Sequence, residues 1–434
     1  MKTAAFYTLG CKVNQVETEQ LKEQFLRQGY EIVPFNCPAD VYVINTCTVT
    51  HVSDRKSRAM VRRIARQQRD SLVVVTGCWA ETDRNQAAAI EGVDLVVGNR
   101  DKEKITDLVE DTIKSSSAKV FWQPVSEATE KLPLWLYSQP HERTRAFIKI
   151  QDGCQSYCTY CIVPYARGPV RSKPPKDVLH EIKQLLQLGY QEIVLTGIHI
   201  GQYGKDINGY NLDQLLAEIL DNVPGDYRLR LGSIEINEIT PAILAFMRQD
   251  NRLCRHLHIP LQSGSDSVLK TMGRKYGRDD FSQMVNEVEA KIPGIAVTVD
   301  VMVGFPGESD ADFADSFNLI DSLKLLDLHV FKYSRRPGTR AAEYSDQIDE
   351  KTKNYRSEQL LKLADKKRNE FYGAHIGQTL RLLVEKQTGT DQYIGLSDNY
   401  LEVLFACKND LRGEFVQVQI ESMQGQQMKG RLIQ

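Results

Sequence analysis

The amino-acid sequence predicts an α/β fold in three parts: an N-terminal open parallel sheet, a central α/β barrel and a small C-terminal β-barrel. Three observations predict this class. Short apolar runs alternate with helix-length segments up to about residue 340, a pattern typical of parallel sheets covered by helices. The C-terminal part instead holds short strand-like runs separated by turn residues. The length of 434 residues exceeds what one ordinary core accommodates.

The N-terminal domain is predicted to span residues 1–115. Polar, helix-length segments such as QVETEQLKEQFLRQ and SDRKSRAMVRRIARQQ separate four apolar runs, TAAFYTLG, DVYVINT, SLVVVTG and VDLVVGN. We therefore expect a sheet with helices on both faces. Residues 116–145 differ, because the segment KSSSAK and three prolines, Pro124, Pro133 and Pro140, are typical of a linker.

A second alternating region, residues 146–368, is predicted to form the barrel. Its strand candidates are AFIKI, EIVLTG, YRLRLGS, RHLHIPL, IAVTVDVMVGFP and DLHVFKYS. Helical segments such as PKDVLHEIKQLLQLG separate them, as an open or closed α/β barrel requires. A long charged helix that begins at EKTKNYRSEQ ends the region. Residues 369–434 supply the strands of the small β-barrel in TLRLLVEK, YIGLSDNYLEVLF, FVQVQIE and MKGRLI.

The composition argues against two broad classes of protein. Lys and Arg total 55 against 57 Asp and Glu, so the chain lacks the overall basic charge of many nucleic-acid binders. Any RNA binding must therefore use local basic patches. No apolar run is long enough to cross a bilayer, and we expect a cytoplasmic protein with no membrane association. Thiols stay reduced in that compartment, so clustered members of the nine cysteines are expected to bind metal.

Three cysteines, Cys154, Cys158 and Cys161, lie within eight residues in the stretch IKIQDGCQSYCTYCIVPYARG. A structural zinc site needs four tetrahedral ligands, and no other His or Cys lies near in sequence, although a distant segment can supply one. Three thiolates fit better around a four-iron, four-sulfur cluster with one iron left open. That open iron can bind and activate a small molecule.

Three other cysteines share a different context. Cys11, Cys47 and Cys78 each follow the end of a predicted parallel strand. Such ends lie along one edge of an open α/β sheet, so these residues are expected to converge. Cysteine is also a common small buried residue, but its recurrence after the first three strands favours a second cluster with an open iron. The remaining cysteines lack this context: Cys37, Cys254 and Cys407. We expect the last two to be packing residues.

The triplet, with Tyr160 before its last cysteine, resembles the radical S-adenosylmethionine enzymes over about residues 146–340. The resemblance implies a partial (β/α)6 barrel and an open iron that chelates S-adenosylmethionine, whose reductive cleavage gives a 5′-deoxyadenosyl radical. It also implies that Glu235 and Gln262, which follow predicted strands, contact S-adenosylmethionine, and that Tyr160 lies near its adenine. The alternative interpretation of Glu235 and Gln262 is a surface glutamate and a turn glutamine.

The presence of two three-cysteine sites on adjacent domains narrows this resemblance to one group of radical S-adenosylmethionine enzymes. The segments LGCKVNQVETE, VINTCTVT and VTGCWAE resemble the N-terminal domain of the methylthiotransferases, and the C-terminal barrel is similar to their TRAM domain, an OB-like RNA-binding module. The resemblance implies two [4Fe–4S] clusters, one on Cys11, Cys47 and Cys78 and one on the triplet, with no catalytic side chain beyond these ligands. It also implies S-adenosylmethionine as methyl donor and radical source, tRNA as partner, and an electron donor such as flavodoxin or ferredoxin.

The family resemblance implies conversion of an unactivated C–H bond into C–S–CH3. The segments CKVNQVETE, TCTVTHVSDRKSR and YSRRPGTRA resemble the branch that methylthiolates C2 of N6-threonylcarbamoyladenosine at position 37 of tRNA, giving 2-methylthio-N6-threonylcarbamoyladenosine. The alternatives within the family are N6-isopentenyladenosine in tRNA and an aspartate of a ribosomal protein. A non-catalytic, metal-containing RNA-binding protein is the alternative from another class.

An arginine stripe indicates RNA binding independently of the family resemblance. In SDRKSRAMVRRIARQQR, arginines recur at three- and four-residue steps, which places them on one helix face: Arg55, Arg58, Arg62, Arg66 and Arg69. Ser53 is expected to cap the helix start. The first four arginines are candidates for tRNA phosphate contact, with a solvated helix face as the alternative. Arg335, Arg336 and Arg340 in FKYSRRPGTRAA are further candidates, or solvated loop charges.

Overall fold

The computed structural model describes residues 1–114, 117–140 and 143–433. The predicted boundary at residues 115 and 116, two residues of the predicted linker (141 and 142) and the predicted end of the last domain at 434 lie outside this part. The chain divides into two compact units. The first comprises Met1–Ser138, Gln151–Lys173 and Ser334–Ala342, and the second comprises Gln139–Ile150, Pro174–Tyr333 and Glu343–Gln434.

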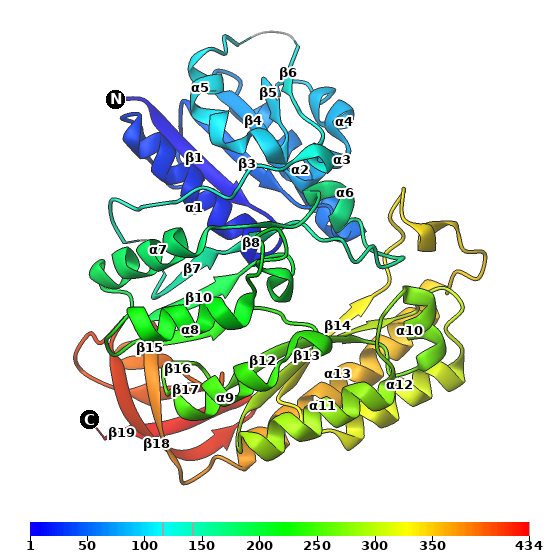
Figure 1. The fold of residues 1–434 in the computed structure, drawn as a ribbon. Coiled ribbons are helices and arrows are strands. Elements are labelled where there is room, and N and C mark those ends of the chain that lie inside the picture. The colour runs from blue at the N-terminus through cyan, green and yellow to red at the C-terminus, as the bar shows by residue number, and fades with distance from the viewer. Residues whose placement is uncertain (115–116, 141–142, 434) are drawn as a thin grey trace. The chain divides into compact units, whose positions relative to one another are not determined.

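The first unit is built on a parallel sheet of six strands in the order β2-β1-β3-β4-β5-β6 (Figure 1). Its strands are β1 (Thr3–Thr8), β2 (Glu31–Ile32), β3 (Val41–Thr46), β4 (Leu72–Gly77), β5 (Leu95–Val97) and β6 (Lys119–Phe121). The four predicted strands correspond to β1, β3, β4 and β5. Strands β2 and β6 were not predicted, because they have only two and three residues. Strand β6 lies within the predicted linker and pairs with β5.

Helices cover both faces of this sheet, as predicted. They are α1 (Lys12–Arg27), α2 (His51–Gln67), α3 (Cys78–Thr82), α4 (Arg84–Ala88) and α5 (Ile105–Glu110). One face packs Leu21 and Phe25 of α1 and Ile105 of α5 against alternate strand residues. The other face packs α2, α3 and α4, where Trp79 is fully buried. Burial on two faces explains why the strands read as continuous apolar runs.

The second unit contains the predicted partial barrel of six parallel strands. Its strands are β7 (Arg145–Lys149), β10 (Glu192–Thr196), β11 (Arg228–Leu231), β12 (His256–Gln262), β13 (Ala296–Val303) and β14 (Asp327–Lys332). They form two sheets, β11-β10-β7 and β12-β13-β14. The bridges Leu229–Leu253 and Ser233–His258 connect the two sheets. The helices between these strands are α7 (Pro175–Gln187), α8 (Leu212–Asn222), α9 (Pro241–Gln249), α10 (Asp266–Met272), α11 (Arg278–Lys291) and α12 (Asp310–Ser322).

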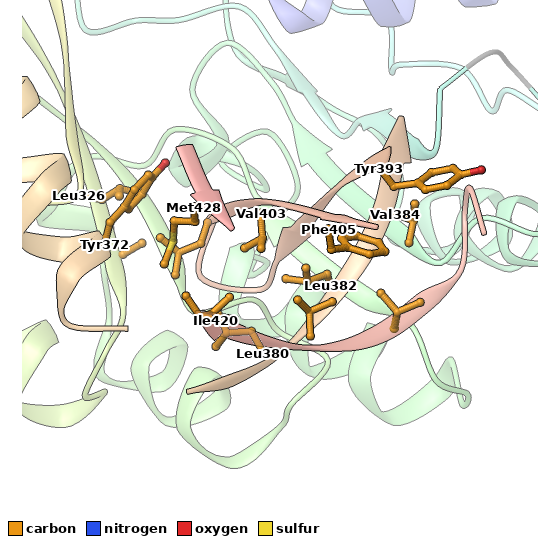
Figure 2. Close-up of a cluster of buried hydrophobic side chains, with 14 residues drawn as sticks. Leu326, Tyr372, Leu380, Leu382, Val384, Tyr393, Val403, Phe405, Ile420 and Met428 are labelled. Carbon is orange, nitrogen blue, oxygen red and sulfur yellow. The ribbon is translucent and has the colours of Figure 1, made fainter. Parts of the chain in front are cut away.

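A closed five-stranded barrel ends the second unit, after the long helix α13 (Glu350–Gly373). Its strands are β15 (Thr379–Gly389), β16 (Gln392–Ser397), β17 (Glu402–Ala406), β18 (Phe415–Gln424) and β19 (Gln427–Leu432). The predicted run YIGLSDNYLEVLF forms two strands, β16 and β17, joined by a turn. Figure 2 shows the core of this barrel, where Leu382, Val403, Phe405 and Met428 point toward one another.

The C-terminal barrel is attached to the first residues of the parallel strands in its own unit. The buried Arg230 pairs with Glu192, at 2.7 Å from Nε to Oε1, and donates to the carbonyls of Ser397 and Asp398 at 3.0 and 2.9 Å. Tyr400 stacks on His256 with ring centroids 4.3 Å apart. This contact occupies the amino ends of the strands, so their carboxyl ends lie at the opposite end of the partial barrel. No described helix is long and apolar enough to cross a membrane.

Candidate functional site

Three cysteines follow three neighbouring strands of the first unit. Cys11 precedes α1 and lies three residues beyond the end of β1, while Cys47 and Cys78 directly follow β3 and β4. Because β1, β3 and β4 are adjacent and parallel, the three residues lie at one edge of the sheet. Cys47 and Cys78 are buried, whereas Cys11 is exposed. The structure therefore brings together the cysteines that the strand pattern singled out.

Glycines allow the chain segments at this edge to approach closely. Gly10 has a φ of +105°, and a Cβ there would lie 2.8 Å from Cβ and 2.9 Å from Sγ of Cys47. Gly77 has a φ of +97°, and its Cβ would lie 2.3 Å from the carbonyl oxygen of Thr46. Both conformations favour glycine, and both positions lack space for a side chain. The glycines next to Cys11 and Cys78 thus permit the three thiols to converge.

The electrostatic environment of these thiols suits a bound cationic centre. Burial raises the pKa of Cys47 to about 11, and the nearby Cys78 adds to this effect. Desolvation of the Cys11 thiol also raises its pKa, although the residue has exposed surface, while Arg167 acts in the opposite direction. Thiolates are the form that binds metal. Ionisation of these buried thiols therefore requires a nearby positive charge, which a bound metal centre would supply.

A buried charge network lies beside this cysteine site, and the sequence analysis did not identify it. Arg167 pairs with Glu17, at 3.2 Å from Nη2 to Oε2, and donates to Oδ1 of Asn14. Lys102 also pairs with Glu17. All four side chains are buried. Asn14 and Glu17 belong to the polar segment CKVNQVETE, and Arg167 belongs to VPYARG. A surface helix or loop would carry similar polar residues, so these segments do not reveal the network, and Lys102 has no distinguishing context either.

The cysteine triplet lies in the segment between β8 (Gln151–Asp152) and the short helix α6 (Val163–Arg167), and this segment also belongs to the first unit. The backbone N–H of Cys154 donates to the carbonyl of Gly168 at 3.1 Å, and that of Cys161 donates to the carbonyl of Cys158 at 3.0 Å. The N–H of Ser156 donates to Sγ of Cys154 at 3.4 Å. Backbone donors to sulfur stabilise thiolate ligands of iron–sulfur clusters, so this loop fits such a cluster.

A late segment of the chain completes the first unit. Arg336 is buried, pairs with Asp54 of α2 at 3.2 Å and donates to Oγ1 of Thr48 at 2.6 Å. The predicted role of Arg336 as a tRNA contact or a solvated charge is therefore wrong, because its guanidinium is used inside the protein. Arg335 and Arg340, in contrast, are exposed.

Glu235 and Gln262 lie at the carboxyl ends of the barrel strands in the second unit, while Tyr160 lies in the cysteine loop of the first. The Glu235 carboxylate accepts a hydrogen bond from Arg274. Desolvation raises the pKa of Glu235, and Arg274 opposes that shift. Gln262 has a φ of +65°, an uncommon conformation for a residue other than glycine, beside a register shift in β12. Such conformations gather at functional sites.

The predicted arginine stripe lies on α2, which begins at His51 rather than at Ser53. Thr50 is the N-cap, and its hydroxyl accepts from the N–H of Ser53, so the predicted cap was wrong by three residues. Arg55, Arg62, Arg66 and Arg69 are exposed, and Arg58 lies 3.6 Å from Asp54. The later arginines line a groove of about 710 Å³ whose lining includes Arg62, Arg66, Arg69, Gln86, Glu91 and Gly92.

Family comparisons assign three segments of the chain. Residues 3–98 match the uncharacterized protein family UPF0004, residues 148–320 match the radical SAM superfamily, and residues 374–433 match the TRAM domain. The chain is 43% identical to the threonylcarbamoyladenosine tRNA methylthiotransferase MtaB of Bacillus subtilis, over 97% of this chain and 94% of that protein. The Aquifex aeolicus protein of the same name is 39% identical over 92% of this chain and 97% of its own length.

Two further comparisons match most of the chain at lower identity. The tRNA-2-methylthio-N(6)-dimethylallyladenosine synthase of Fusobacterium nucleatum is 31% identical over the full length of both chains. Among solved structures, the radical S-adenosylmethionine methyltransferase TsrM of Kitasatospora setae superposes with a TM-score of 0.58 over 79% of this chain and 77% of that chain, at 16% identity. The last comparison supports the fold alone.

Proposed function

Because the chain belongs to the methylthiotransferase family of radical S-adenosylmethionine enzymes, we propose that it methylthiolates C2 of N6-threonylcarbamoyladenosine at position 37 of tRNA. The observation that carries this proposal is the identity of 43% over nearly the whole chain with a relative named for that substrate. The relative named for the dimethylallyl substrate reaches 31%. The product is 2-methylthio-N6-threonylcarbamoyladenosine.

The cofactors of the enzyme are S-adenosylmethionine and two [4Fe–4S] clusters. When bound, they supply the 5′-deoxyadenosyl radical that removes hydrogen from an unactivated C–H bond, and the sulfur and methyl group that replace it. We assign one cluster to Cys154, Cys158 and Cys161 and the auxiliary cluster to Cys11, Cys47 and Cys78. Three thiolates on each cluster leave one iron for an exogenous ligand.

The chain's own side chains position the reactants around these centres. The Ser156 N–H donates to the sulfur of Cys154 and stabilises its thiolate. Glu235 and Gln262 are proposed to hold S-adenosylmethionine, and Tyr160 to lie at its adenine. Arg274 orients the Glu235 carboxylate through their ion pair, which opposes the rise in the pKa of Glu235 that desolvation causes.

RNA binding is proposed to use α2 and the TRAM domain. The exposed guanidinium groups of Arg55, Arg62 and Arg66 recur along one helix face, and Arg58 lies between them. Regularly spaced arginines contact successive phosphates, and the groove beside Arg62 and Arg66 is open to such a strand. Because the proposed substrate is tRNA, we propose a cytoplasmic location for the enzyme. The electron that starts each turnover is proposed to come from a flavodoxin or ferredoxin.

Mass spectrometry of tRNA nucleosides tests the proposed function. We expect cells without the gene to lose 2-methylthio-N6-threonylcarbamoyladenosine and to accumulate its unthiolated precursor. Loss of the methylthio isopentenyl nucleoside would reassign the substrate. Unchanged tRNA with an unmodified ribosomal-protein aspartate would move the enzyme to the protein-modifying branch.

A further inference from the structure

Three titratable side chains that the proposed mechanism does not use meet on one face of the partial barrel in the second unit. His258, Asp300 and His329 belong to the neighbouring strands β12, β13 and β14. Register places Asp300 opposite His329 and His258 opposite Thr298. Helices α11, α12 and α13 lie along one face of this sheet (Figure 1), and the strand residues that alternate with the three side chains, Leu257, Val299 and Leu328, are buried. The three side chains therefore line the inner face of the barrel.

The contacts within this group are specific. Nε2 of His258 lies 3.2 Å from Oδ1 of Asp300, and Nδ1 of His329 lies 3.3 Å from the same oxygen. The hydroxyl of Thr298 lies 2.9 Å from the other ring nitrogen of His258. One carboxylate thus faces two imidazoles. Although desolvation raises the pKa of Asp300, hydrogen bonds from both histidines hold it well below its usual range.

The two histidines differ in what they present to the barrel interior. The side chain of His258 is 14% exposed and lies between Asp300 and Thr298. That of His329 is 52% exposed. Because Nδ1 of His329 faces Asp300, its Nε2 points away from the carboxylate. In its protonated form the imidazole of His329 donates from Nε2 as well as from Nδ1, and such a charge-assisted hydrogen bond suits an anion.

An exposed aromatic ring lies on the same face. Phe331 is two residues after His329 on β14, so strand alternation puts both side chains on the inner face. Its exposed fraction of 44% is high for a phenylalanine in a strand. Exposed aromatic rings are the usual stacking partners of unpaired nucleobases. A ring for stacking and a polar group two residues away form a surface suited to a base with a polar substituent.

The position along the strand places this surface deeper in the barrel than the proposed cofactor contacts. His258 precedes Gln262 by four residues, about 13 Å at the usual strand rise, whereas Asp300 and His329 are in register with Pro260, two residues before Gln262. Gln262 lies at the carboxyl end, where active sites of such barrels gather. A substituent that extends inward from a base at the strand ends would meet His329 and Asp300.

We propose that His258, Asp300 and His329 form a binding subsite for the N6 substituent of the adenosine, with His329 donating to its carboxylate. This inference rests on the proposed function, because the threonylcarbamoyl group carries a carboxylate, a hydroxyl and N–H groups. An isopentenyl group carries none of these. It would leave the polar cluster desolvated without partners, and sites built for hydrogen bonding reject such analogues strongly. The cluster therefore favours the threonylcarbamoyl substrate over the isopentenyl substrate of the same enzyme family.

The experiment compares variants of the holoenzyme, with both clusters in place, on anticodon stem-loop RNAs bearing either N6-threonylcarbamoyladenosine or N6-isopentenyladenosine. His329→Leu removes the donor, and His329→Gln keeps a hydrogen-bonding side chain. His180→Leu, at an exposed position of α7, is the matched control. Three quantities are measured: kcat and KM for methylthiolation, the ratio between the two RNAs, and 5′-deoxyadenosine formed without RNA.

We expect His329→Leu to lower kcat/KM for the threonylcarbamoyl RNA by ~10- to 100-fold, chiefly through KM, as the loss of a charged hydrogen bond predicts. His329→Gln should recover part of this loss. RNA-independent 5′-deoxyadenosine should stay unchanged, which also shows that the variants fold. The discrimination between the two RNAs should fall by a similar factor, and His180→Leu should match the wild type.

Each other outcome has a defined meaning. Wild-type activity on the threonylcarbamoyl RNA with unchanged KM and discrimination in His329→Leu would overturn the subsite and leave the proposed function intact. A wild-type enzyme inactive on that RNA would overturn both. Two histidines and an aspartate also form a known metal-ligand set. One equivalent of zinc or manganese in the wild type that His329→Leu loses would make the cluster a metal site and refute the subsite.

Discussion

Arg167 forms a buried ion pair with Glu17, at 3.2 Å from Nη2 to Oε2, and so joins the segment after Cys161 to the helix after Cys11. Each of these two segments directly follows one cysteine of a proposed cluster, Cys161 for one and Cys11 for the other. Arg167 also lies close enough to Cys11 to favour its thiolate. Within the first unit, the guanidinium of Arg167 therefore links the chain segment next to one cysteine site to the helix next to the other.

Arg167→Gln should destabilise the first unit. Removing one partner of a buried pair leaves the other charge uncompensated, which costs roughly 3–5 kcal/mol. We expect the lower end of that range, because Lys102 still pairs with Glu17. Urea unfolding measures the change. Arg63→Gln, at an exposed position of α2, is the control and should change stability by less than about 0.5 kcal/mol. Equal effects of the two substitutions would contradict a structural role for the pair.

Two cysteine substitutions should separate the functions of the two clusters. Cys158→Ala removes a ligand of the proposed radical cluster and should abolish 5′-deoxyadenosine formation. Cys47→Ala removes a ligand of the proposed auxiliary cluster and should keep cleavage while losing methylthiolation. Both products are measured by mass spectrometry under anaerobic reduction. Normal cleavage in Cys158→Ala, or a full yield of methylthio product in Cys47→Ala, would show the respective assignment to be wrong.

Loss of arginines from α2 should weaken tRNA binding in a salt-dependent manner. Each phosphate contact contributes about 0.7–0.9 to the slope of log affinity against log salt concentration. The double variant Arg62→Gln with Arg66→Gln should therefore reduce that slope by roughly 1.5. Lys351→Gln with Lys362→Gln, on exposed positions of α13, is a control of equal charge. A slope that falls equally in both double variants would indicate a nonspecific effect of net charge.

Much of this architecture followed from sequence patterns. Parallel strands that are buried on two faces appear in the sequence as apolar runs. The cysteines that follow three of these strands converge because neighbouring parallel strands end at the same edge of the sheet. The closed C-terminal barrel followed from its turn-separated strands in the same way. These inferences depend only on local periodicity and on the direction of the strands.

Contacts between distant segments could not be predicted. Arg336 looked like a loop charge, yet it is buried against Asp54, 282 residues away in the chain. Arg167 and Glu17 lie 150 residues apart. Isolated charged residues carry no sign of burial in a single sequence, because polar spacing is the same for a solvated face and for a buried pair. The His258–Asp300–His329 cluster was missed for the same reason, since its members come from three different strands that are far apart in the sequence.

Acid should loosen the attachment of the C-terminal barrel. Desolvation raises the pKa of Glu192, but Arg230, Arg145 and Arg228 hold it below its usual value. A carboxyl with a lowered pKa contributes stability that is lost as pH falls through and below about 4.3, the ordinary value for glutamate. The protection factors of residues 397–400, which correct for the slower intrinsic hydrogen exchange at low pH, should therefore fall on acidification. Glu192→Gln should exchange faster at pH 7 and respond less to acid, unlike the exposed control Glu421→Gln.

The strained backbone of Gln262 allows its conformation and its side chain to be tested separately. A left-handed conformation costs a non-glycine residue roughly 1–2 kcal/mol, which glycine avoids. Gln262→Gly should therefore keep stability within about 1 kcal/mol of the wild type while raising KM for S-adenosylmethionine. Asp391→Gly, at a φ of +59° in the C-terminal barrel, relieves similar strain and should leave that KM unchanged. If both glycine variants cleave S-adenosylmethionine like the wild type, the amide of Gln262 does not bind it, and the strain serves only the bulge in β12.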